Sequence, residues 1–196
     1  MTVEEYLLFE ESQEVRHEYV NGRIFQMTGG TAAHNLMSLN IAASLKTQLK
    51  GSGCRAYMTD IKVRVEATNS FYYPDVIIDC GTFDRSSVFT ASPIFIFEVL
   101  SRSTASTDRR EKLLAYQQIP GLEAYLIVHQ SRKRVDVYRR EHEDDWSVQE
   151  LGSGDDMDLS CGGRTIKLSV DEIYEDTNME SSPDLQVREN AEVYLY

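Results

Sequence analysis

The sequence has little cysteine, and its few cysteines are widely spaced. Cys54, Cys80 and Cys161 are the only three in 196 residues, and no two of them form a C-x-x-C pair. This spacing fits neither a zinc site nor a disulfide framework. We therefore expect a protein of the reducing cytoplasm whose cysteines play no paired role.

Long apolar runs are also missing, and the first residues do not resemble a secretory leader. No stretch approaches the roughly 20 apolar residues that a membrane-spanning helix needs. The first residues, MTVEEYLLFEE, are acidic and carry no basic flank of the kind that precedes a signal peptide. We expect no membrane partner.

Basic residues are outnumbered, with 20 Lys and Arg against 32 Asp and Glu, for a net charge of −12. Binding to nucleic acid through a broad basic face is disfavoured, because such binding scales with the phosphates that Lys and Arg neutralise. An enzyme that cuts nucleic acid is not excluded, since its carboxylates can bind a metal ion. Eleven tyrosines and seven phenylalanines favour a folded chain over a disordered one.

The length suits one domain, which we place at residues 1–176. The remaining residues, 177–196, are polar and end in the apolar run Val193–Tyr196, which we expect to dock on the body or on a neighbouring subunit. A homodimer is the expected assembly.

Hydrophobic spacing predicts an α/β domain with a mixed sheet flanked by helices. An N-terminal helix precedes a hairpin that turns at Asn21-Gly22, a pair that tolerates positive φ. The continuous apolar run 94–100 predicts a central strand buried on both faces. The expected helices are 3–11, 31–50, 107–118 and 169–174, and the other expected strands are 18–27 (the hairpin), 61–65, 76–78, 123–128, 134–138 and 146–151.

Glu98 lies inside the most apolar strand, where an ionised carboxylate is costly unless it is paired or bound to a metal. It is either a metal ligand or a carboxylate at the strand's end that lies in solvent or pairs with an arginine. Asp75 follows Pro74 at the entrance of the strand 76–78 and is either a second ligand or a turn aspartate. Glu18 on the hairpin is either a third carboxylate at the same site or a solvated charge.

Lys112 lies four residues after Asp108 on one helical face, which suits a surface ion pair as well as a site lysine. His34 lies at a predicted helix start and suits a cap or packing residue. A small-molecule hydrolase that uses His34 would lack a partnered nucleophile. The four histidines show no zinc-type spacing.

Read in order, these residues resemble a known nuclease pattern. Thr2–Leu7, Glu18–Gly22, Pro74–Val76, Phe97–Ser101 and the later set of Ser103, Thr104, Asp108, Glu111, Lys112, Tyr116 and Glu123–Val128 carry the resemblance. They resemble the PD-(D/E)XK superfamily and, more narrowly, the bacterial endonuclease family called Uma-two. The resemblance covers about residues 1–176.

The resemblance implies a restriction-endonuclease-like fold and metal-dependent hydrolysis of phosphodiester bonds in DNA. Asp75 and Glu98 would bind Mg²⁺ or Mn²⁺, Glu18 would assist them, and Lys112 would be the catalytic lysine. The expected substrate contacts are His34, Ser101, Arg109 and Tyr116. Arg109 belongs to a local basic cluster with Arg102, Arg110 and Lys112.

Two positions depart from the family pattern. The superfamily places its lysine two residues after the glutamate, where this chain has Leu100, so Lys112 would be a migrated lysine. Arg102 stands where the family usually has proline. An alternative is a catalytically degenerate nuclease fold that serves as a binding module. Three observations favour it: the missing lysine two residues after the glutamate, the net charge of −12 and the apolar end Val193–Tyr196.

Overall fold

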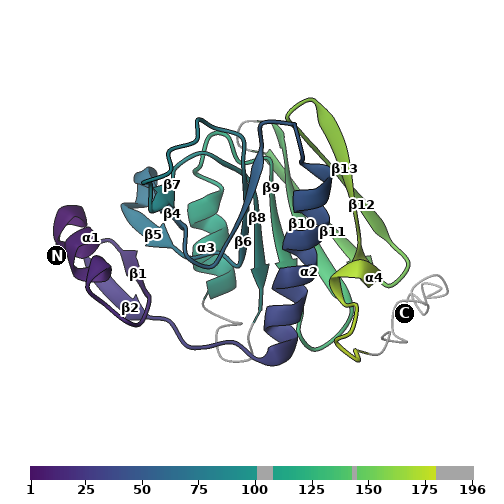
Figure 1. Ribbon diagram of the computed structural model, residues 1–196, viewed down its shortest axis with the longest axis horizontal. Helices are drawn as coiled ribbons and strands as arrows, with labels where there is room; N and C mark the ends of the chain where they lie inside the picture. The colour runs from purple at the N-terminus through teal and green to yellow at the C-terminus, as the bar shows by residue number, and fades with distance from the viewer. Residues whose placement is uncertain (101–107, 143–144, 180–196) are drawn as a thin grey trace, which may run out of the picture.

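The structure, a computed structural model, describes residues 1–100, 108–142 and 145–179 (Figure 1). Its helices are α1 (Val3–Glu11), α2 (Ala32–Gln48), α3 (Asp108–Tyr116) and α4 (Val170–Ile173). Its strands are β1 (His17–Val20), β2 (Arg23–Gln26), β3 (Arg55–Met58), β4 (Lys62–Val65), β5 (Ser70–Tyr72), β6 (Val76–Asp79), β7 (Phe89–Thr90), β8 (Pro93–Val99), β9 (Ala124–Val128), β10 (Arg134–His142), β11 (Asp145–Gly152), β12 (Asp156–Cys161) and β13 (Arg164–Ser169).

A six-stranded mixed sheet forms the centre of the fold, in the order β11-β10-β9-β8-β6-β3. β8 and β9 are parallel, whereas β6 and β10 pair antiparallel with their neighbours. The apolar run 94–100 forms most of β8, an inner strand, as its lack of alternation predicts. The predicted α/β class and the mixed sheet are confirmed.

The two faces of this sheet are covered differently (Figure 1). α2, the β12–β13 hairpin and α4 pack on one face, where Phe95 and Phe97 of β8 join the core. α3 and residues of β4 and β5 cover the other face, where Ile96 of β8 is buried. Because side chains alternate along a strand, Glu98 points to the same face as Ile96, toward α3.

The N-terminal segment is built from local signals that the sequence carries. Thr2 and Glu5 form a capping box at the start of α1, each side chain bonding the other's backbone N–H. Asn21 and Gly22 turn the β1–β2 hairpin with φ of 45° and 91°. The hairpin extends a five-stranded sheet of order β2-β1-β5-β4-β7.

Lys62 of β4 is 5% exposed, and its Nζ donates to the Tyr73 hydroxyl at 3.2 Å. One sequence expectation about local structure is wrong: the cysteines are not all unpaired, because Cys54 and Cys80 form a disulfide. The sequence signal failed because β3, which brings Cys54 opposite Cys80, has no clear apolar alternation.

Some expectations fall outside the described residues. These are the side chains of Ser101, Arg102, Asp108 and Arg109 and the apolar end of the tail, 193–196. Across the part of the chain that is described, no helix has the length and apolarity needed to cross a membrane.

Candidate functional site

A polar cavity of about 340 Å³ opens where the hairpin, α2, β6, β8 and α3 meet. Residues 25–30, which run from the end of β2 into the chain before α2, line part of the cavity. The lining also includes ionisable groups. These are Glu18, His34, Tyr73, Asp75, Glu98 and Lys112. The structure thus brings together all four residues that the sequence predicts as metal ligands or catalytic lysine.

Glu98 is held by two residues of α3. Lys112 Nζ lies 3.3 Å from Glu98 Oε1, and the Tyr116 hydroxyl donates to the same oxygen at 3.1 Å. The two donors are four residues apart, so the helix presents both on the face that packs on β8. Among the described residues, the charged partner of the buried carboxylate is therefore a lysine.

Glu18 completes the pairing of the lysine. Its Oε1 lies 2.8 Å from Lys112 Nζ and accepts the backbone N–H of Tyr73 at 3.3 Å. Lys112 is 8% exposed and bridges carboxylates from β1 and β8. Its interpretation as a surface ion pair is wrong, because the lysine points into the fold.

Asp75 lies at the entrance of β6, where Pro74 introduces the strand. Its Oδ2 accepts the backbone N–H of Val99 at 2.6 Å, and its Oδ1 lies 3.2 Å from His34 Nε2. His34 stands at the start of α2, whose N-cap Thr31 accepts the His34 backbone N–H at 3.2 Å. The aspartate is thus fixed across the sheet and from the helix, and not by a local turn.

The cavity perturbs the ionisation of its residues. Burial raises the pKa of Glu98 above its ordinary value, and the ammonium of Lys112 opposes that rise in part. Burial by itself would lower the pKa of Lys112, but the charges of Glu98 and Glu18 hold it well above its ordinary value. The hydrogen bond with Asp75 raises the pKa of His34. Lys112 is accordingly a fixed cation.

A second buried network holds Tyr73, whose backbone N–H donates to Glu18. The Tyr73 hydroxyl donates to Glu10 Oε1 at 2.9 Å, and the same oxygen accepts the backbone N–H of His17 at 2.9 Å. Glu10 is 3% exposed and belongs to α1. Sequence reasoning missed Tyr73 and Glu10. The Tyr72-Tyr73-Pro74 sequence was a weak signal, because tyrosine is common in any core.

The carboxylates offer the hard oxygen donors that Mg²⁺ prefers. In the described residues, the one group of three or more His, Cys, Asp or Glu side chains whose ligand atoms all lie within 4.8 Å is a cysteine cluster. Glu18, Asp75 and Glu98 are thus not packed as a closed cage. Mg²⁺ does not require a closed cage, because it is usually bound by one or two carboxylates together with substrate phosphate and water.

Of the four expected substrate contacts, the structure describes the side chains of two, His34 and Tyr116. His34 lines the cavity. Tyr116 is fully buried and supports Glu98 from the α3 side. The side chains of Ser101 and Arg109 lie outside the described residues, and Arg110 is exposed on α3.

The chain matches the model of the Uma2 family, described as "Putative restriction endonuclease", over residues 3–170. It is 33% identical over 175 residues to "Uncharacterized protein slr1290" of Synechocystis sp. (strain ATCC 27184 / PCC 6803 / Kazusa), covering 89% of this chain and 91% of that one. It is 30% identical over 154 residues to "Uncharacterized protein sll1609" of the same strain, covering 77% and 87%.

A solved structure has a similar fold. The crystal structure of "a putative nuclease belonging to DUF820" from Anabaena variabilis ATCC 29413 superposes with a TM-score of 0.71 at 16% identity. The match covers 89% of this chain and 97% of that one. At this identity the likeness establishes the fold, and the site must be judged from its own geometry.

Proposed function

Because the chain belongs to the Uma2 family of restriction-endonuclease-like proteins, we propose that it is a metal-dependent endonuclease that hydrolyses phosphodiester bonds in DNA. The observation that carries the proposal is the convergence of Asp75, Glu98 and Lys112 on one polar cavity. These residues come from β8, α3 and the entrance of β6, which are far apart in the sequence. Two carboxylates beside one cation suit the chemistry of phosphate ester cleavage.

Asp75 and Glu98 are the proposed ligands of Mg²⁺ or Mn²⁺. When bound, the ion would neutralise charge on the attacked phosphate and activate water. Asp75 is held by Val99 and His34, so its carboxylate keeps one orientation. Glu98 is held in the same way by Lys112 and Tyr116.

Lys112 is the proposed catalytic lysine. An ammonium has three N–H donors, and the contacts with Glu18 and Glu98 account for two of them. We propose that the third donates to a phosphate oxygen in the cavity that Lys112 lines. We assign Glu18 mainly to holding this lysine, because its carboxylate lies closer to Nζ than that of Glu98 does.

Plasmid nicking tests the proposal. Wild-type protein should convert supercoiled DNA to open circles with Mg²⁺ or Mn²⁺ and should not do so with EDTA. The Glu98→Ala variant should lose this activity. Asp156→Ala is a matched control, because it removes an exposed carboxylate of the β12–β13 hairpin. Full cleavage by folded Glu98→Ala would refute the assignment.

A second candidate is a binding module that has the nuclease fold but no turnover. The observation that favours it is the ion pairing of Lys112 with both Glu18 and Glu98, because contacts within the protein already hold these two carboxylates in place. This candidate predicts that the folded wild-type protein binds DNA or a protein partner but leaves plasmid intact at every metal concentration.

A further inference from the structure

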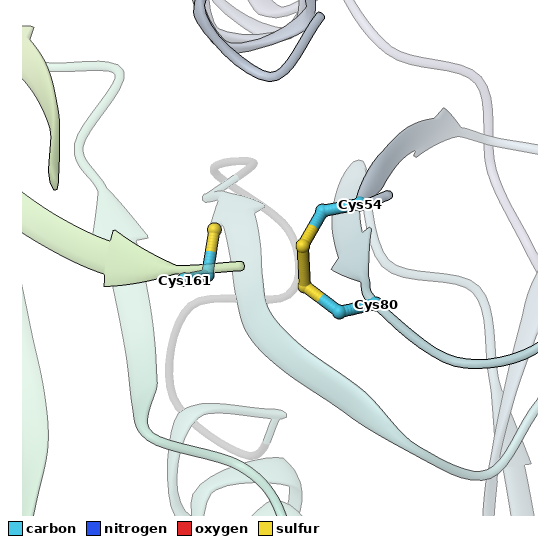
Figure 2. Close-up of side chains that lie close together, drawn as sticks. All are labelled: Cys54, Cys80 and Cys161. Atoms are coloured by element: carbon cyan, nitrogen blue, oxygen red, sulfur yellow. A yellow bond between two sulfur atoms is a disulfide. The ribbon is translucent and has the colours of Figure 1, made fainter. Parts of the chain in front are cut away.

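Three cysteines that are far apart in the sequence meet on the α2 side of the central sheet (Figure 2). Cys54 precedes β3, Cys80 follows β6 and Cys161 ends β12. Their three Sγ atoms all lie within 4.8 Å of one another. Cys54 and Cys80 form a disulfide, and Cys161 is a buried free thiol.

The pairing of β3 with β6 explains the disulfide. Arg55 of β3 lies opposite Asp79 of β6 in an antiparallel ladder. Cys54 and Cys80 are the next residues outward on each strand, so the register places them face to face.

The tip of the β12–β13 hairpin is held against this disulfide. Arg164 Nη1 donates to the Lys50 carbonyl at 2.8 Å, and Lys167 N donates to Gln48 Oε1 at 2.9 Å. Gly162 packs so closely that a Cβ at this position would lie 2.8 Å from Cys54 Sγ. The glycine therefore allows the hairpin, and Cys161 with it, to approach Cys54.

We propose that these three residues form a thiol–disulfide exchange site in which Cys161 attacks Cys54 and releases Cys80. The Cys161 thiolate forms a bond to Cys54 Sγ while the Cys54–Cys80 bond breaks. The electron pair of the broken bond stays on Cys80 Sγ, which takes up the proton that Cys161 gave up. No net oxidation occurs, so the exchange needs no external oxidant.

Burial supports this direction of exchange. Cys54 and Cys161 are 8% and 6% exposed, whereas Cys80 is partly exposed. The released thiol is therefore the one that small thiols and disulfides in solution can reach. Burial, with a smaller contribution from the charge of Glu123, raises the pKa of Cys161, so the exchange is slow near neutral pH.

Exchange moves a covalent link from one part of the fold to another. The Cys54–Cys80 bond joins two strands of the central sheet, whereas a Cys54–Cys161 bond joins the sheet to the β12–β13 hairpin. Asp75 and Cys80 lie at opposite ends of β6, so this site is separate from the polar cavity and does not depend on the proposed nuclease function.

Three thiolates at one point can also bind zinc. The bond between two of the sulfurs favours exchange, because bonded sulfurs are not available as thiolate ligands. Zinc binding is accordingly an outcome that the experiment must separate from exchange.

Trapping with N-ethylmaleimide tests the proposal on the full chain purified without reductant. The three cysteines fall in separate tryptic peptides, 51–55, 65–85 and 141–164, so mass spectrometry can assign each linkage. After long incubation at mildly alkaline pH, we expect most of the label on Cys80 together with a Cys54–Cys161 cross-linked peptide. Label confined to Cys161, with Cys54–Cys80 intact, would overturn the proposal.

Two variants test the proposed linkages without depending on how fast each cysteine of the wild type is labelled. Cys161→Ser should keep the Cys54–Cys80 bond and take up no label. Cys80→Ser, treated with oxidised glutathione, should form the Cys54–Cys161 disulfide, and a folded variant that fails to form it would contradict the proposal. Reduced wild-type protein that binds one zinc ion per chain and protects all three cysteines would assign the cluster to metal binding instead.

Discussion

At the scale of single residues, the chain lacks the lysine of the superfamily pattern, but Lys112 places a cation at the site. Leu100 stands where the superfamily has lysine, and it is buried in the core beneath α3. A lysine there would leave its charge among apolar side chains. α3 instead supplies the ammonium, which lies 3.3 Å from Glu98 Oε1.

Lys112→Met should reduce DNA cleavage by at least about 100-fold, because a donor to the reacting phosphate is lost. It should also lower the free energy of unfolding by about 3 kcal/mol, since two mostly buried carboxylates lose their cation. Cleavage kinetics and urea unfolding check the two effects. Lys167→Met, which removes an exposed lysine, should change neither, and wild-type cleavage by Lys112→Met would exclude the catalytic role.

His34→Ala should lower the affinity for Mg²⁺ and should have a smaller effect on the stability of the fold. His34 orients Asp75 through a 3.2 Å contact, and such supporting contacts are typically worth about 10- to 100-fold in metal affinity or activity. The Mg²⁺ concentration that gives half-maximal cleavage should therefore rise. An unchanged Mg²⁺ dependence would assign His34 to helix packing alone.

At the scale of elements, β9 and β10 are joined by a buried charged cluster away from the cavity. His129 Nε2 lies 2.8 Å from Asp136 Oδ2, and Arg134 Nε donates to Asp136 Oδ1 at 2.6 Å. The Tyr174 hydroxyl donates to the carbonyls of His129 and Arg134, which ties the turn after α4 to the same hairpin.

This cluster predicts a specific pH dependence of stability. Burial would raise the pKa of Asp136, but the hydrogen bonds from His129 and Arg134 outweigh it and hold the pKa below its ordinary value. A carboxyl with a lowered folded-state pKa stabilises the fold above its unfolded-state pKa, and this contribution is lost as the pH falls through the folded-state pKa.

Asp136→Asn should therefore lower the melting temperature at neutral pH. In acid, the difference in melting temperature between the variant and the wild type should become smaller. Thermal unfolding followed by circular dichroism across the acid range measures both. A difference in melting temperature that stays the same at every pH would show that the charge of Asp136 does not contribute to stability.

Elements with strong local signals could be predicted from the sequence. α1, the Asn21-Gly22 hairpin, α2 and β8 lie where caps, turn residues and apolar spacing place them. The β12–β13 hairpin was missed, because it lies in a polar stretch and its Gly162-Gly163 turn has no strongly apolar strands beside it. β3 was missed because its four residues alternate weakly.

At the scale of the whole molecule, the family resemblance carried by the ordered motifs predicted that Glu18, Asp75, Glu98 and Lys112 share a site, and all four line one cavity. The sequence could not predict their pairing. That Glu18 and Glu98 both reach Lys112 depends on how α3 lies across β8, and the support of Glu18 by Tyr73 depends on contacts between distant strands. The cysteine cluster likewise arises from tertiary packing.

Three carboxylates, those of Glu18, Asp75 and Glu98, line the cavity beside the ammonium of Lys112. A divalent cation would offset the remaining negative charge there and allow a phosphate to approach. The assembly as a homodimer and the substrate DNA remain predictions, and the central claim is that the cavity binds the cation.

Binding of Mn²⁺, measured by electron paramagnetic resonance on wild-type and Asp75→Asn protein, tests that claim most directly. Both samples must first show the same circular dichroism spectrum. The account predicts a Mn²⁺ site in the wild type that is lost or strongly weakened in the variant, because one of its two proposed ligands becomes a neutral amide. Equal Mn²⁺ binding by the two proteins would contradict it.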